Sequence, residues 1–208
     1  MDIGVLMLFQ NHPNLPMADY DMYKKELGVC EMAEPLGFDS IWAVEHHFTD
    51  YTLCPNPIEM LTYLAGMTDK IKLGTGAIII PWHKDPLRVA TDIAMLDNLC
   101  DRRLLLGIGR GIGRVEYDGF GVDMNDSRGI FEESSQMILD MLETGKAKDH
   151  DGEHFKQIAR DIRPAPLPPY LDRTYVTCQS PETAEIIARL PIWFGHDGVC
   201  DITVEIPR

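Results

Sequence analysis

Apolar runs of strand length alternate with segments of helical periodicity along most of this 208-residue chain. A run such as residues 3–9, Ile-Gly-Val-Leu-Met-Leu-Phe, has no polar face, which is typical of a strand buried on both sides. Strict alternation of such strands with helices predicts a parallel sheet with helical crossovers. The expected strands are residues 3–9, 38–45, 71–80, 104–109, 174–179 and 191–194, and the expected helices are residues 19–36, 57–65, 86–99, 127–142 and 180–190.

Local signals set the ends of these helices. Asp19 is expected to cap the first helix, and Asn56 precedes a proline at the expected start of the second. Gly37 and Gly145 stand where the first and fourth helices should end. Beyond Gly145 the chain becomes polar and rich in proline, so the regular alternation is interrupted there.

Two α/β architectures fit this pattern. A chain of 208 residues suits one domain with a sizeable core. A doubly wound open sheet fits this length comfortably, whereas a (β/α)8 barrel typically needs about 250 residues. Since only five complete strand–helix units and a sixth strand are counted, periodicity alone slightly favours the open sheet.

Composition narrows the possible partners and compartment. The net charge of −14 argues against nucleic acid or an anionic membrane as a partner. No apolar run approaches the roughly 20 residues of a membrane span, and the N-terminus lacks the features of a signal peptide. The cysteines are odd in number and without CxxC spacing, so we expect reduced thiols in a cytoplasmic protein; they are Cys30, Cys54, Cys100, Cys178 and Cys200.

The second expected strand ends abruptly in Glu45, His46 and His47. In α/β folds, reactive groups stand at the C-terminal ends of strands, so this trio is the first candidate site. Alternation along a strand would point Glu45 and His47 one way and His46 the other. Acid–base work by one histidine is favoured, because an imidazole with a pKa of about 6.5 exchanges protons at neutral pH. The spacing does not favour a metal site, and local hydrogen bonding by all three residues is the alternative.

Three further segments are weaker candidates. Residues 107–113 alternate glycine with other residues and include Arg110, whose guanidinium suits phosphate, although a flexible turn explains the pattern as well. Ser180 and Thr183 lie where a helix should begin, which suits either an anion site or plain capping. Glycines at 74 and 76 within a strand indicate close approach of a flat group or of another backbone.

Four longer stretches resemble the bacterial luciferase-like flavin-dependent monooxygenases. They are Phe-Asp-Ser-Ile-Trp-Ala-Val-Glu-His-His-Phe-Thr-Asp (38–50), Lys-Leu-Gly-Thr-Gly-Ala-Ile-Ile-Ile-Pro-Trp-His-Lys-Asp-Pro-Leu-Arg (72–88), Arg-Leu-Leu-Leu-Gly-Ile-Gly-Arg-Gly (103–111) and Phe-Gly-Val-Asp-Met-Asn-Asp-Ser-Arg (120–128). The resemblance covers about residues 1–192. It implies a (β/α)8 TIM-type barrel in place of the open sheet, incomplete here with about five to six βα units.

The resemblance also implies a function. Members of this family use reduced FMN and O2 to oxygenate a small organic substrate such as an aldehyde, ketone or terpene, and some relatives use coenzyme F420 instead. A flavin reductase as supplier of reduced FMN, and a homo- or heterodimer, are expected with it. By motif, His46 matches the catalytic histidine and Glu45 precedes it at a functionally sensitive position.

The cofactor-binding residues follow from the same resemblance. Gly76-Ala77 matches a dipeptide that forms a non-prolyl cis bond beneath the flavin ring. Arg110 matches the arginine that binds the flavin phosphate, and Ser180 with Thr183 match the hydroxyl and amide site for the same phosphate. The resemblance thus joins three separate weak signals into one expected site.

Two departures from the family pattern change what is expected. Gly109 stands in place of the reactive cysteine of the luciferase catalytic subunit, so a general monooxygenase is expected rather than a light emitter. Residues 195–208 do not resemble the family, so residues 1–194 are expected to form a partial barrel followed by an atypical tail. A non-catalytic flavin-binding or partner-stabilising module, or an inactive truncated fragment, are therefore the alternatives.

Overall fold

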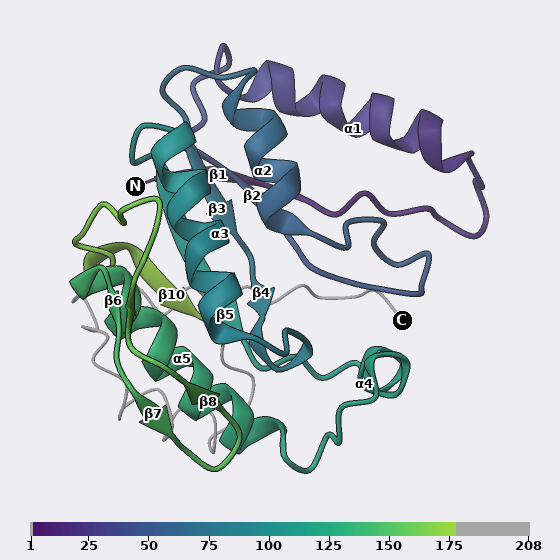
Figure 1. Cartoon of the computed structure of the whole chain (residues 1–208). Helices are drawn as coiled ribbons and strands as arrows, with labels where there is room; N and C mark the ends of the chain where they lie inside the picture. The colour runs from purple at the N-terminus through teal and green to yellow at the C-terminus, as the bar shows by residue number, and fades with distance from the viewer. Residues whose placement is uncertain (1, 178–208) are drawn as a thin grey trace.

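The computed structural model describes residues 2–177. Its core is a parallel sheet with strands in the order β1-β2-β3-β5-β10, and β4 also pairs with β5 (Figure 1). These strands are β1 (Gly4–Met7), β2 (Ser40–Ala43), β3 (Lys72–Thr75), β4 (Ile78–Ile79), β5 (Leu104–Gly109) and β10 (Thr174–Val176). The expected sixth strand, the helix at 180–190 and the tail at 195–208 lie outside the described residues.

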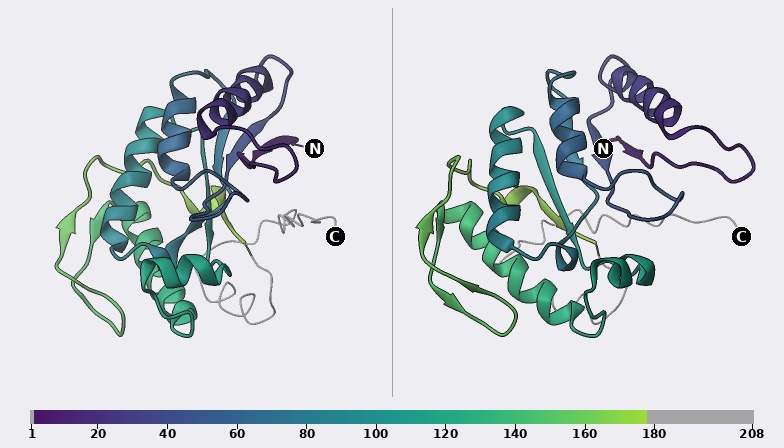
Figure 2. Two further views of the ribbon diagram at one scale, coloured as in Figure 1. Left: turned by 90° about the vertical axis from the view of Figure 1, so that its right-hand side faces the viewer. Right: turned by 45° about the vertical axis from the view of Figure 1, so that its right-hand side comes forward.

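Four longer helices connect the strands and lie along one side of the sheet (Figure 2). They are α1 (Asp19–Ala33), α2 (Pro57–Ala65), α3 (Pro86–Leu99) and α5 (Ser127–Thr144). A short helix, α4 (Arg114–Phe120), follows β5 in the segment between residues 109 and 127, for which the sequence pattern predicts neither helix nor strand. The 3-10 turns are η1 (Ile80–Trp82) and η2 (Leu171–Arg173), and small two-stranded sheets join β6 (Lys146–Ala147) to β9 (Arg160–Asp161) and β7 (His150–Asp151) to β8 (Lys156–Gln157).

Helix ends follow the local signals in α2 and α5 but not in α1. Asn56 accepts a hydrogen bond from the Glu59 amide at the start of α2. Gly145 caps α5 with φ of +70°, as expected, whereas α1 ends at Ala33, earlier than expected, and Gly37 with φ of +84° lies in the turn beyond its Glu34 cap. Asp19, however, is the first helical residue rather than the cap, a position held by Ala18 without a side-chain bond. None of the helices within residues 2–177 is long and apolar enough to cross a membrane.

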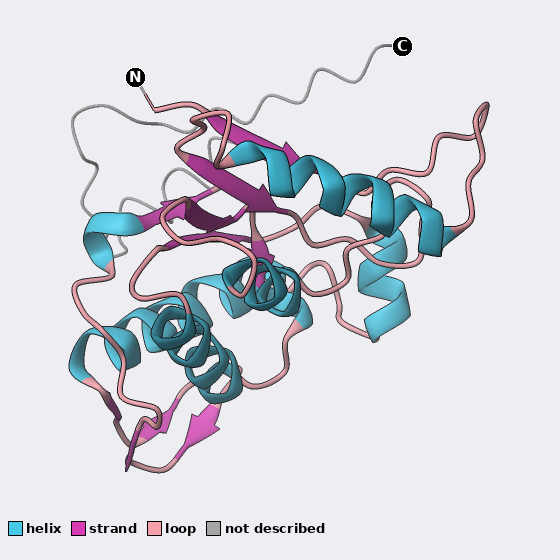
Figure 3. Cartoon of the chain, turned by 90° about the horizontal axis from the view of Figure 1, so that it is seen from above, coloured by secondary structure: helices cyan, strands magenta, loops and turns pink. Residues whose placement is uncertain are grey.

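The strand order decides between the two architectures. Each new strand joins the growing sheet on the same side, so the order never reverses as it does in a doubly wound sheet. The open-sheet preference from periodicity is therefore wrong, and the incomplete (β/α)8 barrel implied by the family resemblance is confirmed. Figure 3 shows the strands side by side with the helices along their outer side.

The curvature of the sheet agrees with this winding. Trp42 on β2 and Tyr175 on β10 contact edge to face, with ring centroids 5.6 Å apart. The two strands are separated by β3 and β5, so in a flat sheet their backbones would lie about 14 Å apart. The sheet therefore curves around these rings, and their face is the inner one. The outer face is fully buried against the helices; its residues include Ile41, Leu73, Leu104, Leu106 and Ile108.

Trp42 also explains one pair of glycines in the sequence. A Cβ at Gly74 would lie 2.3 Å from ring atoms of Trp42, and one at Gly4 would lie 2.9 Å from the indole nitrogen. That nitrogen donates to the Ser40 hydroxyl at 2.9 Å. The flat group expected next to Gly74 is thus a side chain of the protein itself, and the indole covers the glycines of the two neighbouring strands.

The predicted strand at 71–80 is split by a bulge. Pairing with β5 passes from Gly74 opposite Leu105 to Ile78 opposite Ile108, so four steps on one strand face three on the other. In this gap the Thr75 hydroxyl donates to the Gly107 carbonyl and accepts from the Gly107 amide, both at 2.7 Å. A side chain thus replaces the missing backbone bonds and holds the strands together beside the candidate site.

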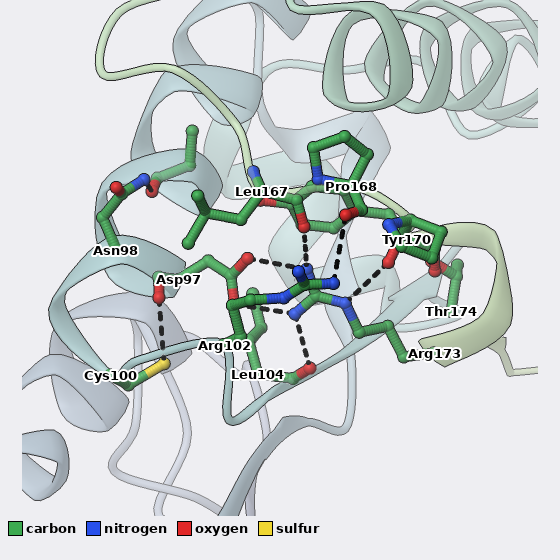
Figure 4. Close-up of polar contacts among 12 residues, drawn as sticks. Asp97, Asn98, Cys100, Arg102, Leu104, Leu167, Pro168, Tyr170, Arg173 and Thr174 are labelled. Atoms are coloured by element: carbon green, nitrogen blue, oxygen red, sulfur yellow. Dashed lines mark hydrogen bonds and ion pairs between the residues drawn. The ribbon is translucent and has the colours of Figure 1, made fainter.

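A buried ion pair attaches the last described strand to α3 (Figure 4). Both oxygens of Asp97 accept from the Arg173 guanidinium at 2.7 Å. The same guanidinium lies 4.2 Å from the Tyr170 ring centroid and donates to three backbone carbonyls, of Leu104, Leu167 and Pro169. All N–H groups of the Arg173 guanidinium are therefore hydrogen-bonded, and Arg173 is the residue that immediately precedes β10.

Candidate active site

The candidate residues gather at the C-terminal ends of the parallel strands, which we call the rim. Glu45, His46 and His47 follow β2, the Gly76–Ala77 bond separates β3 from β4, and Arg110 follows β5. Because all these strands are parallel, their C-terminal ends meet at one edge of the sheet. Ser180 and Thr183 lie outside the described residues, so their expected role stays a prediction.

Glu45 is a buried carboxylate with three hydrogen-bond donors around it. It is 3% exposed and accepts from the Ile79 amide at 2.7 Å. The imidazole Nε2 atoms of His47 and His83 lie 3.2 Å and 3.1 Å from its Oε1. The expected alternation is confirmed, since Glu45 and His47 meet while His46 turns to a different partner. His83 was not predicted as a site residue, although it follows β4 and η1 much as Glu45 follows β2.

The charges in this cluster shift the pKa values of Glu45 and His83. Burial acts to raise the pKa of Glu45, but hydrogen bonds from His47 and His83 outweigh it and leave the pKa below its ordinary 4.5. Burial acts to lower the pKa of His83, but the hydrogen bond to Glu45 and its charge raise it above the ordinary 6.5. Both shifts therefore favour the charged forms of Glu45 and His83.

A stability profile against pH tests this pairing. The contribution of Glu45 to folding stability is present above pH 4.5 and is lost as the pH falls through its lowered pKa. The contribution of His83 to folding stability is complete below pH 6.5 and is lost as the pH rises through its raised pKa. Glu45→Gln is therefore expected to lower the free energy of unfolding by about 1–3 kcal/mol. The loss should be largest between these two pH values and shrink at alkaline pH, as measured by urea unfolding.

The matched control is Glu31→Gln, which changes an exposed carboxylate on α1. It should alter stability by no more than about 0.5 kcal/mol at any pH. A loss at Glu45→Gln that stays constant across the pH range would show that charge pairing with His83 contributes nothing.

His46 pairs with a carboxylate from the unpredicted helix α4. Its Nδ1 lies 2.8 Å from Oε1 of Glu116, and the same oxygen accepts from the His47 amide at 3.2 Å. The Glu116 side chain is buried, whereas a third of the His46 side chain is exposed. His46 lines a cavity of about 530 Å³ together with Tyr23, Phe48 and several neighbours from the loop after β2. An exposed imidazole on a buried carboxylate is an arrangement suited to proton transfer.

The peptide bond between Gly76 and Ala77 is cis, as the family resemblance implied. A Cβ at Gly109 would lie 3.5 Å from the Cβ of Ala77 and 2.4 Å from Oγ1 of Thr177. The cis bond and the position of the missing cysteine are thus neighbours on the rim. A larger side chain at residue 109 would displace Thr177, so the small residue is part of how β5 and the chain after β10 fit together.

Arg110 is anchored on the rim through both its guanidinium and its backbone carbonyl. Its Nη1 donates to the Ser127 hydroxyl at 3.1 Å, and its carbonyl accepts from the Tyr117 hydroxyl. Its Nε is buried and has no partner within residues 2–177. A guanidinium fixed in this way can take an anion without a change of its anchoring bonds.

Ile79 contacts both the segment after β2 that carries Glu45 and the end of β5 that precedes Arg110. Its amide donates to Glu45, and its side chain would lie 3.3 Å from a Cβ at Gly109, the residue before Arg110. The structure therefore brings the predicted Glu45, Ala77 and Arg110 segments to one place.

Comparison with known proteins agrees with this geometry. Residues 1–198 match the sequence profile of the luciferase-like monooxygenases. The chain belongs to this family. The α chain of alkanal monooxygenase from Photorhabdus luminescens is 32% identical over 189 residues, which cover 91% of this chain and 51% of that relative.

Two other luciferase-like relatives extend the comparison. The oxygenase component of a flavin-dependent trigonelline monooxygenase from Acinetobacter baylyi is 30% identical over 79% of this chain and 45% of its own. The crystal structure of monooxygenase RslO1 from Streptomyces bottropensis superposes with a TM-score of 0.81 at 28% identity, covering 91% of this chain and 57% of that one. The chain thus spans about half the length of the curated relatives it matches.

Proposed function

We propose that this chain is a flavin-dependent monooxygenase that uses reduced FMN and O2 to oxygenate a small organic substrate, such as an aldehyde, ketone or terpene. The observation that carries the proposal is Arg110, anchored on the rim with a buried Nε that lacks a partner within residues 2–177. The alkanal and trigonelline monooxygenases support the reaction class.

The residues on the rim fit the two ends of FMN. The phosphate dianion suits the guanidinium of Arg110, with Ser180 and Thr183 as further donors. The flat ring suits the strand ends at Gly76 and Ala77, where side chains are small. When bound, the reduced flavin supplies the electrons that activate O2.

The protein's own groups hold and move protons around this cofactor. His46 is the acid–base residue, because its partly exposed imidazole lines the cavity beside the rim and is held from behind by the buried carboxylate of Glu116. Glu45 is buried, so we place it in a positioning role through His47, His83 and the Ile79 amide. In this arrangement Glu45 fixes the loop after β2, on which His46 is carried.

The same proposal includes the setting of the enzyme. A flavin reductase would supply reduced FMN, and the term "alpha chain" in the relative's name favours a dimer, either homo- or heteromeric. The cytoplasm is the proposed location. The high negative charge favours neither nucleic acid nor an anionic membrane as partner.

Titration with FMN, followed by its fluorescence, tests the binding site. Arg110→Met is expected to weaken binding by about 10-fold or more, since a hydrogen bond to a charged group contributes about 1.5–3 kcal/mol. Arg88→Met, which removes an exposed arginine on α3, should leave the affinity unchanged. Equal affinity of the wild type and Arg110→Met would contradict the assignment of the phosphate site.

The same titration with coenzyme F420 discriminates between the two cofactors. Tighter binding of F420 than of FMN would replace the monooxygenase proposal with hydride transfer. Absence of binding to both would favour an inactive fragment.

A further inference from the structure

We propose that Glu116 is the positioning residue of His46, and that Gly113 is glycine because the Glu116 carboxylate occupies the space of a side chain there. The role of His46 rests on the proposed function, whereas the positioning itself can be measured without any flavin. Glu116 lies in a segment without periodic signal, 70 residues beyond His46 in the chain.

The contacts of Glu116 fix both the ring and the backbone of the catalytic loop. Its Oε1 lies 2.8 Å from Nδ1 of His46 and accepts the amide of His47 at 3.2 Å. A carboxylate buried to 2% exposure thus makes two bonds with adjacent residues. The bond from the His47 amide holds Oε1 of Glu116 in place. Rotation of the His46 ring would therefore break the bond between Nδ1 and this fixed oxygen.

This geometry selects one tautomer of His46. An ionised carboxylate is only an acceptor, so Nδ1 must carry the hydrogen that lies between the two groups. In the neutral imidazole Nε2 is then the acceptor. Nε2 makes no hydrogen bond within residues 2–177, so it is the atom that can receive a proton from a group in the cavity. A free histidine favours the opposite tautomer, with the hydrogen on Nε2, so the preference must come from Glu116.

Gly113 supplies the space that this arrangement needs. A Cβ at residue 113 would lie 1.5 Å from Oε2 and 2.7 Å from Cδ of Glu116. The contact is with the end of a flexible side chain, so an alanine can be accommodated if the carboxylate moves away. Gly113→Ala should therefore separate Glu116 from His46 while the residue at 116 stays glutamate.

The simpler explanation is that Glu116 only stabilises α4. Glu116 lies in the first turn of this helix, where a negative charge is favourable in any case. That role would change stability when Glu116 is replaced but would not affect the tautomer of a histidine on another segment. The tautomer is therefore the measurement that separates the two explanations.

The test uses the whole chain labelled with ¹⁵N-histidine, with long-range proton–nitrogen spectra recorded at a pH where His46 is neutral. The wild type is expected to show hydrogen on Nδ1. Glu116→Ala and Gly113→Ala should shift His46 towards hydrogen on Nε2, whereas Glu116→Gln, whose amide oxygen still accepts, should keep the wild-type tautomer. Gly28→Ala, on α1 with open space around it, is the matched glycine control and should change nothing.

Kinetics provide the second readout. Glu116→Ala should lower kcat by up to the 10²–10⁴-fold that acid–base catalysis typically contributes, with KM little changed. Glu116→Gln should restore most of the rate. Hydrogen on Nε2 in the wild type, or an unchanged tautomer in both Glu116→Ala and Gly113→Ala, would overturn the inference. If the tautomers are as expected but the protein does not bind FMN, the positioning role of Glu116 is supported and the proposed function is refuted.

Discussion

Replacing Asp97 with alanine is expected to lower the free energy of unfolding by about 3–5 kcal/mol. Asp97 is fully buried, and the Arg173 guanidinium that it binds through two bonds is largely buried as well. Without the carboxylate, the guanidinium would remain in the interior facing three carbonyls and the ring of Tyr170, with its charge no longer neutralised. The penalty is the desolvation of a charge that has lost its partner.

Urea unfolding of the two proteins measures this loss. The matched control is Asp92→Ala on the same helix, which removes a partly exposed carboxylate 2.8 Å from Nε of the exposed Arg88. That pair is solvated and should contribute at most about 0.5 kcal/mol. Comparable small losses in both variants would mean that the Asp97–Arg173 pair does not anchor β10.

His46→Ala is expected to lower turnover by about 10²–10⁴-fold while FMN binding is retained. The expectation follows from the position of His46, which lines the 530 Å³ cavity with an imidazole held on its far side by Glu116. Alanine removes the proton acceptor but none of the residues proposed to hold the phosphate or the ring. The His46→Ala variant should therefore lose turnover but keep its affinity for FMN.

Oxygen consumption with reduced FMN and a panel of aldehydes, ketones and terpenes provides the measurement. His154→Ala, in the β7–β8 hairpin beside α5, is the control histidine and should behave as the wild type. An unchanged rate in His46→Ala would exclude it as the acid–base residue. Flavin binding without oxygen consumption in the wild type would favour the non-catalytic module instead.

Most elements were predictable because their signals are local. Asn56 and Asp85, each followed by proline, begin α2 and α3, and the apolar run at 104–109 coincides with β5. The direction of winding was not predictable from periodicity, since alternating strands and helices have the same pattern in an open sheet and in a barrel. The resemblance to a family supplied that choice.

The candidate site was predictable only in part. Glu45 and His46 were identified because they interrupt an apolar strand, and the Gly76–Ala77 bond because its motif resembles that of the family. Glu116 and His83 were missed, since each acts through a partner many residues away. A short helix such as α4 has too few turns to show a periodic pattern.

The indole of Trp42 has a consequence for how this sequence can diverge. It fills the space above Gly74 and next to Gly4, so neither glycine can acquire a side chain while the tryptophan remains. A smaller residue at position 42 would open a cavity that a side chain at residue 74 could fill, and at residue 4 as well once the Ser40 hydroxyl, 2.5 Å from the Cβ position, turns away. We therefore expect substitutions at positions 4, 42 and 74, which lie on three adjacent strands, to occur together rather than independently.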